Sequence, residues 1–444
     1  MDVNKTYKLQ IEDYDMNGFG ISHLDNKVIF VEGAMKDEEV IAKITNIHKK
    51  YAFAEAVRIL TKSELRIDPI CPYFNECGGC DLMHMPYEIE KQIKEKKVKN
   101  TLRLTDSVKF NPIISNDNIL GYRNKVMVPF LRTVDDEVVY GFYAKKSHFI
   151  IPMDKCLISN DIANNIIHLI NRYLNVFHIS IYDELTNTGL FREVMIRNTK
   201  NNDFMVVLVV TKDYNFKGLI DLLTSEFPQI KSIYLNINSK QTNVVLSNEF
   251  KLIYGDSVII ENILGLKFQV SASSFMQVNH DQCEKLYTEA FRLANLNENM
   301  NVIDAYCGMG SITLNIAKRV KHVTGIEVVE SAIINANENK KINNIDNADF
   351  ICGKCEDEIL HLASQKQIDA IFVDPPRKGC DITFIDTVIK MQIPKIVYIS
   401  CNVATLQRDV EILKKNGYEL KEVTPCDLFS RNSHIETVAL LSLK

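Results

Sequence analysis

Hydrophobic and polar residues alternate in short runs over the first sixty positions of the chain. These runs occupy residues 7–11, 27–31, 39–47 and 52–60. Turn-forming pairs, among them Asn17-Gly18 and Asp25-Asn26, separate them. Alternation with a period of two is typical of half-buried strands, and so many short strands in so few residues favour a small closed sheet. We therefore predict an OB-type β-barrel over residues 1–60.

The last third of the chain has a different rhythm, in which apolar runs alternate with helical segments. The apolar runs lie at residues 301–305, 323–326, 348–351, 370–373 and 395–399. Continuous apolar runs between helices are typical of strands buried on both faces of a parallel sheet. We predict an α/β, Rossmann-like domain over residues 271–444, with ligands at the carboxyl ends of its strands.

The middle of the chain, residues 61–270, mixes both patterns and predicts an α+β domain. A cysteine-rich connector is followed by a helical stretch over residues 86–104. Strand-like runs then follow at residues 138–143, 204–211, 232–236 and 242–246. Because 444 residues are too many for one ordinary core, we expect three domains with boundaries near residues 60 and 270.

Composition indicates the general class of the protein and its expected location in the cell, but it does not identify the function. Apolar residues make up 46% of the chain and charged residues 25%, an ordinary globular balance. No apolar run approaches the roughly 20 residues of a membrane span, and the N-terminus carries no secretory signal. We expect a cytoplasmic protein without membrane contact, and a monomer. The net charge of -5 argues against indiscriminate nucleic-acid binding but allows a local basic face.

A glycine turn follows the first strand of the predicted α/β domain. Residues 304–310, with the sequence DAYCGMG, lead into a helix. Glycines let the backbone approach a ligand, and Glu327 at the end of the next strand suits ribose hydroxyls. The dinucleotide pattern G-x-G-x-x-G is incomplete, which favours S-adenosylmethionine over NAD. From this turn alone, a tight strand-to-helix corner without a ligand remains the alternative.

Three short motifs occupy further strand ends, where this fold places its chemistry. They are Asp374-Pro375-Pro376-Arg377, Ser400-Cys401-Asn402 and, just before the last strand, His434-Ile435-Glu436. Asp-Pro-Pro loops also occur in enzymes that methylate exocyclic amines, where the loop ends in an aromatic residue. An amine-directed nucleic-acid methyltransferase is therefore one alternative, although an arginine stands at that position here.

The combination of a cysteine and a glutamate at these strand ends suits a different reaction. Carbon 5 of uracil is too weak a nucleophile to take a methyl group directly. A thiolate that adds to carbon 6 generates an enolate at carbon 5, and a base must later remove the carbon-5 proton. Cys401 and Glu436 supply a nucleophile and a base. A lone cysteine at a strand end is more often a small buried residue, and a lone glutamate is more often a solvated carboxylate. The hypothesis therefore depends on the occurrence of both residues together.

Four cysteines of the central region form a second candidate site. Cys71, Cys77 and Cys80 are spaced C-x5-C-x2-C, and Cys156 lies further along the chain. Four thiolates suit tetrahedral zinc and a [4Fe–4S] cluster equally well. Because the wide first gap differs from C-x3-C-x2-C, the spacing argues against a radical S-adenosylmethionine enzyme.

The motifs together resemble those of the RNA 5-methyluridine methyltransferase family over nearly the whole chain. The resemblance rests on the sequence SSFMQVN at 273–279, the turn at 304–310, and the motifs around Asp374, Cys401 and Glu436. The segment with Gly18-Phe19-Gly20 looks like the family's RNA-binding TRAM module. The family's cluster-bearing ribosomal branch often has asparagine where this chain has Ser311, a departure that puts one cofactor contact in doubt.

The resemblance implies a role for each candidate residue. Cys401 would be the nucleophile and Glu436 the base. Four residues would line the pocket for S-adenosylmethionine and the target base: Gln277, Tyr306, Glu327 and Asp374. Cys71, Cys77, Cys80 and Cys156 would hold a [4Fe–4S] cluster. The implied partner is RNA, with 23S ribosomal RNA favoured over transfer RNA.

A basic stretch over residues 85–150 is the candidate RNA-contacting surface. Lysines cluster on its predicted helix, at positions 91, 94, 96, 97 and 99. Basic groups suit phosphates, and neighbouring aromatic residues such as Tyr122 and Phe142 suit splayed bases. A lysine-rich helix can equally be a solvated face, and the sequence does not separate these two interpretations.

Overall fold

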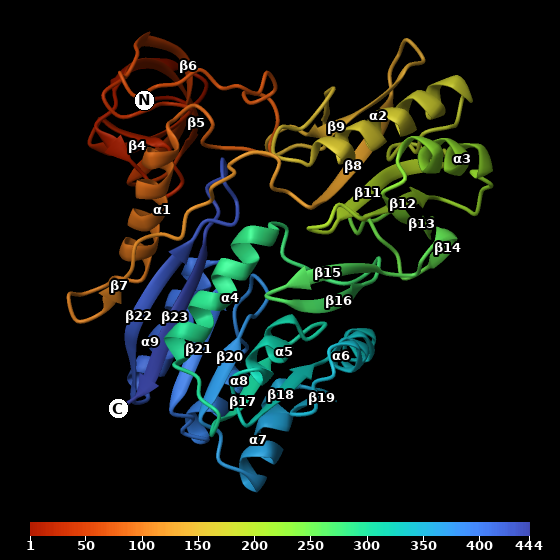
Figure 1. Ribbon diagram of the computed structural model, residues 1–444. Helices are drawn as coiled ribbons and strands as arrows, with labels where there is room; N and C mark the ends of the chain where they lie inside the picture. The colour runs from red at the N-terminus through yellow and green to blue at the C-terminus, as the bar shows by residue number, and fades with distance from the viewer.

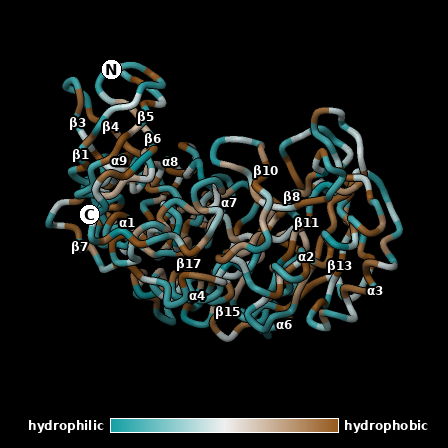
Figure 2. Tube along the Cα trace, turned by 90° about the horizontal axis from the view of Figure 1, so that it is seen from above, coloured by the Kyte–Doolittle hydropathy of each residue, from teal (hydrophilic) through white to brown (hydrophobic).

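The computed structural model describes all 444 residues and consists of three bodies (Figure 1). A small barrel at the N-terminus and a central sheet with two helices lie side by side above a larger C-terminal sheet. Figure 2 shows hydrophobic residues gathered along the strands and hydrophilic residues along many of the outer loops. No helix is both long and apolar enough to cross a membrane.

The N-terminal body is a six-stranded sheet with the strand order β1-β5-β6-β4-β3-β2. Its strands are β1 (Thr6–Gln10), β2 (Asp13–Tyr14), β3 (Gly20–Leu24), β4 (Lys27–Glu32), β5 (Glu39–Ile47) and β6 (Tyr51–Thr61). Asp25 and Asn26 have φ values of 52° and 60°, which forms the two-residue turn that joins β3 to β4. Alternate residues point inward to a small core, so the predicted barrel is confirmed.

The central body is a seven-stranded sheet with the order β10-β9-β8-β11-β12-β13-β14. Its elements are β8 (Lys125–Arg132), β9 (Val138–Tyr143), β10 (Ile150–Pro152), α2 (Asp161–Val176), β11 (Phe191–Asn198), β12 (Phe204–Val210), α3 (Lys217–Glu226), β13 (Ile230–Ile237) and β14 (Phe250–Gly255). All seven residues of β12 are buried. Residues of β12 contribute alternately to a core with α2 and α3 and to the core shared with the C-terminal body.

One predicted strand of this region, residues 242–246, does not form. The side-chain amide of Asn238 donates hydrogen bonds to the carbonyl oxygens of Val244 and Val245, at 2.8 and 2.9 Å. These acceptors are therefore satisfied by a side chain instead of a neighbouring strand. The apolar pattern of the segment gave no sign of this local alternative.

The C-terminal body is an eight-stranded sheet with the order β19-β18-β17-β20-β21-β23-β22-β7. The parallel strands are β17 (Asn301–Ala305), β18 (His322–Glu327), β19 (Ala348–Cys352), β20 (Ala370–Val373) and β21 (Lys395–Ser400), followed by β22 (Tyr418–Cys426) and β23 (Glu436–Leu443). The helices are α4 (His280–Ala294), α5 (Ser311–Ala317), α6 (Glu330–Ile342), α7 (Cys355–Gln365), α8 (Ile382–Lys390) and α9 (Val403–Lys415). The predicted Rossmann-like fold is confirmed, and β23 lies antiparallel between β21 and β22.

The bodies are joined by a hairpin and by one long helix. The hairpin β15 (Ile259–Ile263) and β16 (Leu266–Val270) packs between the central sheet and the C-terminal body. The helix α1 (Tyr87–Thr101) begins one residue after the predicted start, with Pro86 as its N-cap. It packs on α9 and β22, and β7 (Lys109–Phe110) pairs with β22 as an edge strand.

The lysines of α1 make more contacts within the protein than was predicted by either interpretation of the sequence, an RNA-contacting face or a solvated face. Lys94 is 0% exposed and forms ion pairs with Glu90 and Asp427, at 2.7 and 2.6 Å. Lys96 pairs with Asp13 of the barrel at 2.6 Å. Lys94 is therefore neither an RNA contact nor a solvated residue, because a buried ammonium needs paired carboxylates.

Candidate active site

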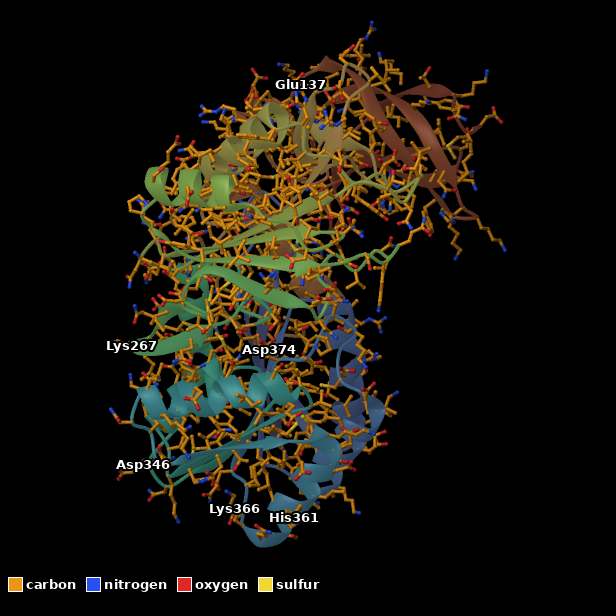
Figure 3. The ribbon with its side chains drawn as sticks, turned by 90° about the vertical axis from the view of Figure 1, so that its right-hand side faces the viewer. Glu137, Lys267, Asp346, His361, Lys366 and Asp374 are labelled. Atoms are coloured by element: carbon orange, nitrogen blue, oxygen red, sulfur yellow. The ribbon has the colours of Figure 1, made fainter.

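Three strand ends bring the predicted catalytic groups to one edge of the C-terminal sheet. Asp374 follows β20, and Cys401 follows the adjacent parallel strand β21. Glu436 is the first residue of β23, whose antiparallel register places Thr437 opposite Ser400. The start of β23 therefore lies beside the end of β21, whose other neighbour is β20. In Figure 3, Asp374 lies inside the molecule, between the C-terminal sheet and the strands above it.

The ionisable groups at this edge influence one another. Glu436 is 3% exposed, and burial together with the Asp374 carboxylate raises its pKa to about 8. Burial raises the pKa of Asp374 to about 7. Burial, Glu436 and Asp374 raise the pKa of the Cys401 thiol to about 11, while Arg377 opposes the rise. Two carboxyl groups, a thiol and a guanidinium thus form one electrostatic unit.

Arg377 lowers the pKa of Cys401, and helix α9, which begins just after Cys401 with the side chain of Asn402 as its cap, also favours the thiolate. Burial and two carboxyl groups nevertheless outweigh these effects and keep the resting thiol protonated. Any nucleophilic attack by this thiol would therefore require loss of its proton, for which the carboxylates close by are candidate acceptors.

The glycine turn after β17 has the backbone conformation that the sequence indicated. Gly308 and Gly310 have φ values of 53° and 83°. A Cβ atom on Gly310 would lie 2.7 Å from the ring of Phe350, so a side chain has no room there. The amide of Gly308 donates a hydrogen bond to Glu327 at 3.3 Å. The turn therefore brings bare backbone next to a carboxylate, as a nucleoside pocket requires.

Glu327 is held in place by the backbone around it. One carboxylate oxygen accepts hydrogen bonds from the amides of Val328 and Val329, at 2.8 and 3.0 Å, and the other accepts from Gly308. The carboxylate is half-buried at the end of β18, where β17 and β18 finish together. Its orientation is fixed before any ligand binds.

Asp304 is a candidate functional residue that the sequence reasoning missed. It is fully buried at the end of β17, and only one of its oxygens has a partner, the Thr313 hydroxyl at 2.5 Å. Burial, with the charges of Asp374 and Glu327, raises its pKa to about 7. The signal was present in the sequence, since Asp304 opens the glycine turn at a strand end.

Gln277 and Tyr306 are the other two residues predicted to line the pocket, and they come from different loops. Gln277 is 7% exposed in the loop between β16 and α4, and its backbone carbonyl accepts a hydrogen bond from the side-chain amide of Asn124 at 3.0 Å. The ring of Tyr306 packs on Phe384 of α8, with ring centroids 5.5 Å apart. Its backbone is left-handed, with φ of 63°. A contact between either side chain and a cofactor remains a prediction.

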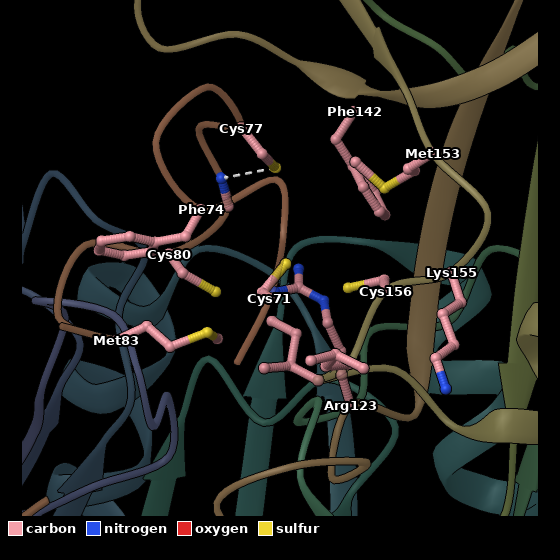
Figure 4. A pocket seen from close by; sticks show the side chains of 13 residues that line it. Cys71, Phe74, Cys77, Cys80, Met83, Arg123, Phe142, Met153, Lys155 and Cys156 are labelled. Carbon is pink, nitrogen blue, oxygen red and sulfur yellow. Dashed lines mark hydrogen bonds between the residues drawn. The ribbon is translucent and has the colours of Figure 1, made fainter. Parts of the chain in front are cut away.

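The four cysteines of the second candidate site line one cavity of about 160 Å³, whose other lining residues are mostly apolar. Figure 4 shows the sulfur atoms of Cys71, Cys80 and Cys156 turned toward a common space. The sulfur of Cys77 accepts a hydrogen bond from the amide of Gly79 at 3.3 Å. The four side chains do not form a group close enough to hold a single metal ion.

The environment of these thiols suits a group that stabilises thiolates. Burial raises the pKa of Cys71 and Cys77, and it raises that of Cys80 further. Arg123 and Lys155 line the same cavity and can offset negative charge. Half-buried thiols in a cavity lined by apolar side chains and two cations are compatible with an anionic iron–sulfur group, which holds its cysteines further apart than one ion does.

Comparison with known proteins connects these features to a family. The sequence matches the tRNA (uracil-5-)-methyltransferase family over residues 87–444 and the TRAM domain over residues 2–57. An uncharacterized RNA methyltransferase of Clostridium acetobutylicum is 40% identical, covering 99% of this chain and 97% of the relative. One of Staphylococcus aureus is 38% identical, covering 98% and 97%.

A solved structure agrees with these sequence matches. The tRNA (uracil-54, C5)-methyltransferase of Pyrococcus abyssi, in complex with S-adenosyl-L-homocysteine, is 25% identical in sequence. Its TM-score is 0.78, and the comparison covers 98% of this chain and 99% of that one. The chain therefore belongs to the tRNA (uracil-5-)-methyltransferase family, and it is an S-adenosylmethionine-dependent RNA uracil-5-methyltransferase with an N-terminal TRAM domain.

Proposed function

We propose that the protein methylates carbon 5 of a uridine in 23S ribosomal RNA through a covalent bond between Cys401 and carbon 6 of the base. The observation that carries the proposal is the meeting of Cys401, Glu436 and Asp374 at one sheet edge. A non-covalent methyltransferase would need neither the thiol nor a buried base at this point. The target uridine must leave its helix to reach them.

The proposed reaction uses the two groups in turn. The sulfur of Cys401 bonds to carbon 6 as the thiol proton passes to a neighbouring carboxylate. Carbon 5 then takes the methyl group from the sulfonium, which leaves S-adenosylhomocysteine. Glu436 removes the carbon-5 proton, the bond between sulfur and carbon 6 breaks, and aromatic 5-methyluridine is released. One proton is lost for each methyl group transferred.

We also propose that Gln277, Tyr306, Glu327 and Asp374 line the pocket for the cofactor and the target base. The fixed carboxylate of Glu327 suits the ribose hydroxyls. Asp304 is fully buried and Asp374 is half-buried, and their carboxyl groups attract a cation only when they are ionised. S-adenosylmethionine carries a sulfonium charge, so its affinity depends on that ionisation.

The affinity for S-adenosylmethionine should accordingly rise with pH. Because the pKa of Asp304 and Asp374 is about 7, both groups are mostly protonated at pH 6 and ionised at pH 8. We expect the dissociation constant, measured by calorimetry, to fall roughly tenfold over this range. S-adenosylhomocysteine, which lacks the sulfonium charge, should show a weaker dependence, and Asp304→Asn should reduce the difference. Equal slopes for the two ligands would contradict the proposal.

The choice of RNA rests on the resemblance to the ribosomal branch, through the four cysteines and the N-terminal module. The Pyrococcus abyssi enzyme acts on tRNA, so the two targets must be separated by experiment. We expect cells that lack the protein to lose 5-methyluridine from 23S ribosomal RNA at one or two positions, while tRNA keeps its own. Mass spectrometry of purified RNA measures both. Loss from tRNA alone would move the substrate to that class.

We propose that Cys71, Cys77, Cys80 and Cys156 hold a [4Fe–4S] cluster. The shared cavity, its apolar walls and the two cations support this assignment. Protein purified without oxygen should be brown, with broad absorbance on the order of 400 nm and about four irons per chain. Cys156→Ser should lose the colour, whereas Cys283→Ser, at a buried thiol elsewhere, should keep it. Colourless protein with stoichiometric zinc would refute the cluster.

The domain boundaries and the oligomeric state are proposed on similar grounds. We propose domains at 1–60, 61–270 and 271–444, in a monomer. The separate sheets of residues 1–60, 125–255 and 301–444 support the three-part division. Because α1 and β7 pack on the third body, residues 87–110 join it by contact although they precede the central sheet.

A further inference from the structure

The loop between β22 and β23, residues 427–435, leads directly into Glu436 and is held in an unusual conformation. Arg431 has φ of 70°, a left-handed backbone that costs energy in a residue with a large side chain. Its side chain is buried against α1, and its guanidinium donates a hydrogen bond to the carbonyl of Met85 at 3.1 Å. A conformation of this kind persists only where the surroundings impose it.

One set of contacts to this loop comes from the segment that carries Cys80. The amides of Asp81 and Leu82 donate hydrogen bonds to the carbonyl of Arg431, at 2.9 and 3.1 Å. The Asp81 carboxylate accepts from both the amide and the hydroxyl of Ser433, at 3.1 and 3.0 Å. The side chain of Asn432 donates to the carbonyl of Gly79 at 3.3 Å. The residues on both sides of Cys80 thus bond to the loop.

Helix α1 holds the loop from the other side. Glu90 accepts a hydrogen bond from the amide of Arg431 at 2.8 Å, and Lys97 donates to the carbonyl of Ser433 at 3.0 Å. The buried ammonium of Lys94 binds Asp427 and the carbonyl of Phe429. These contacts fix the beginning and the middle of the loop. The approach to His434 and Glu436 depends on Ser433, whose amide and hydroxyl both bind Asp81, while Lys97 binds only its carbonyl.

We infer that Asp81 is a positioning residue for Glu436, and that it couples the four-cysteine site to the catalytic base. The inference rests on the proposed function, in which Glu436 removes the carbon-5 proton. Asp81 is covalently adjacent to Cys80, so a group that fixes the Cys80 sulfur also fixes the carboxylate that holds Ser433. Loss of that group would loosen the loop three residues before the base.

The variant that tests this inference is Asp81→Ala, with Glu76→Ala as its matched control. Glu76 is an exposed carboxylate in the same connector, and its side chain has no hydrogen-bond or ion-pair partner. We expect Asp81→Ala to lower kcat by about tenfold or more, with the KM for S-adenosylmethionine unchanged. It should also accumulate a denaturant-resistant adduct with RNA, because the nucleophile is intact and the base is misplaced. Glu76→Ala should behave as the wild type.

A second measurement does not depend on catalysis. Hydrogen exchange of the amides in residues 431–436 should become about tenfold faster in Asp81→Ala, since the Ser433 amide loses its acceptor. Asp81→Asn retains an acceptor oxygen and should restore most of the protection. Cys80→Ser should raise exchange in the same residues, in protein prepared without oxygen. If Asp81→Ala folds poorly, Ser433→Ala tests the same contact, because it removes the hydrogen bond from the Ser433 hydroxyl to Asp81 and keeps the one from the Ser433 amide.

The outcomes separate the inference from the function on which it rests. If Asp81→Ala matches Glu76→Ala in adduct and in exchange, Asp81 does not position the loop. If Asp81→Ala loosens the loop but Cys80→Ser does not, the coupling to the cysteine site is wrong. If Glu436→Gln itself forms no adduct, the proposed role of Glu436 fails, and the exchange data alone then decide whether Asp81 holds the loop.

Discussion

Replacing Cys401 by alanine is expected to abolish methylation, with a fall in kcat of at least about 10⁴-fold, on the scale seen when a covalent nucleophile is removed. Without the sulfur, carbon 5 of uracil remains a poor nucleophile, and neither the pocket nor the base can compensate. The measurement is transfer of a labelled methyl group from S-adenosylmethionine to RNA at saturating cofactor. Binding of S-adenosylhomocysteine should be unchanged, because Cys401 follows β21 and the nucleoside-type turn lies at β17 and β18.

A matched thiol provides the control for this variant. Cys352 is exposed at the end of β19 in the same domain, and Cys352→Ser should keep turnover within a few-fold of the wild type at saturating cofactor. Turnover by Cys401→Ala near the wild-type rate would refute the covalent route. It would instead favour direct methyl transfer, as in the amine-directed enzymes that use an Asp-Pro-Pro loop.

Replacing Glu436 by glutamine is expected to stop the reaction later, after the methyl group has been transferred. The thiol can still add to carbon 6, but no base removes the carbon-5 proton, so the enzyme should remain bonded to methylated RNA. We expect kcat to fall by about 10²- to 10⁴-fold, the range typical of a lost general base. Denaturing electrophoresis should show a stable complex of one chain with one RNA, and peptide mapping should locate the bond at Cys401.

The raised pKa of Glu436 leads to a related prediction for the wild-type protein, in which pH replaces the mutation. Because burial and Asp374 raise that pKa to about 8, the group is protonated at pH 6 and cannot act as a base. An adduct formed by the wild type at pH 8 and then shifted to pH 6 should therefore persist, and it should be released when the pH is raised to 9, where Glu436 is ionised. The adduct of Glu436→Gln should show no such release. An adduct formed equally by Glu436→Gln and by its combination with Cys401→Ala would contradict the mechanism.

Local sequence patterns were sufficient for much of the fold and the site. Alternation with a period of two marked the barrel strands, and buried apolar runs marked the parallel strands, because both reflect the immediate surroundings of a strand. The turn at Gly308 and Gly310 was recognisable because both residues have positive φ values, which favour glycine, and Gly310 also packs against Phe350 without room for a side chain. The positions of Asp374 and Cys401 followed as well, because parallel strands end at the same edge of a sheet.

Other features depended on contacts between distant parts of the chain, and local pattern could not reveal them. The lysines of α1 were indistinguishable in the sequence. Lys94 is nevertheless buried, because it forms an ion pair with Asp427, which is 333 residues away in the sequence. Residues 242–246 had a strand-like pattern, but Asn238 takes their carbonyl oxygens. The raised pKa of Cys401 likewise results from burial and from two carboxyl groups that approach it only in the folded protein.

By itself, the sequence determined which chemical groups this protein has and at which strand ends most of them stand. Only the tertiary structure decided how Glu436 comes to lie near Cys401 and Asp374. Strand β23 enters the sheet antiparallel between β21 and β22, so its first residue, Glu436, lies where the parallel strands finish. The contacts of Asp81 and Glu90 with the preceding loop then hold it there. Strand direction and long-range hydrogen bonds arise from packing of the whole chain, and no local period in the residues encodes them.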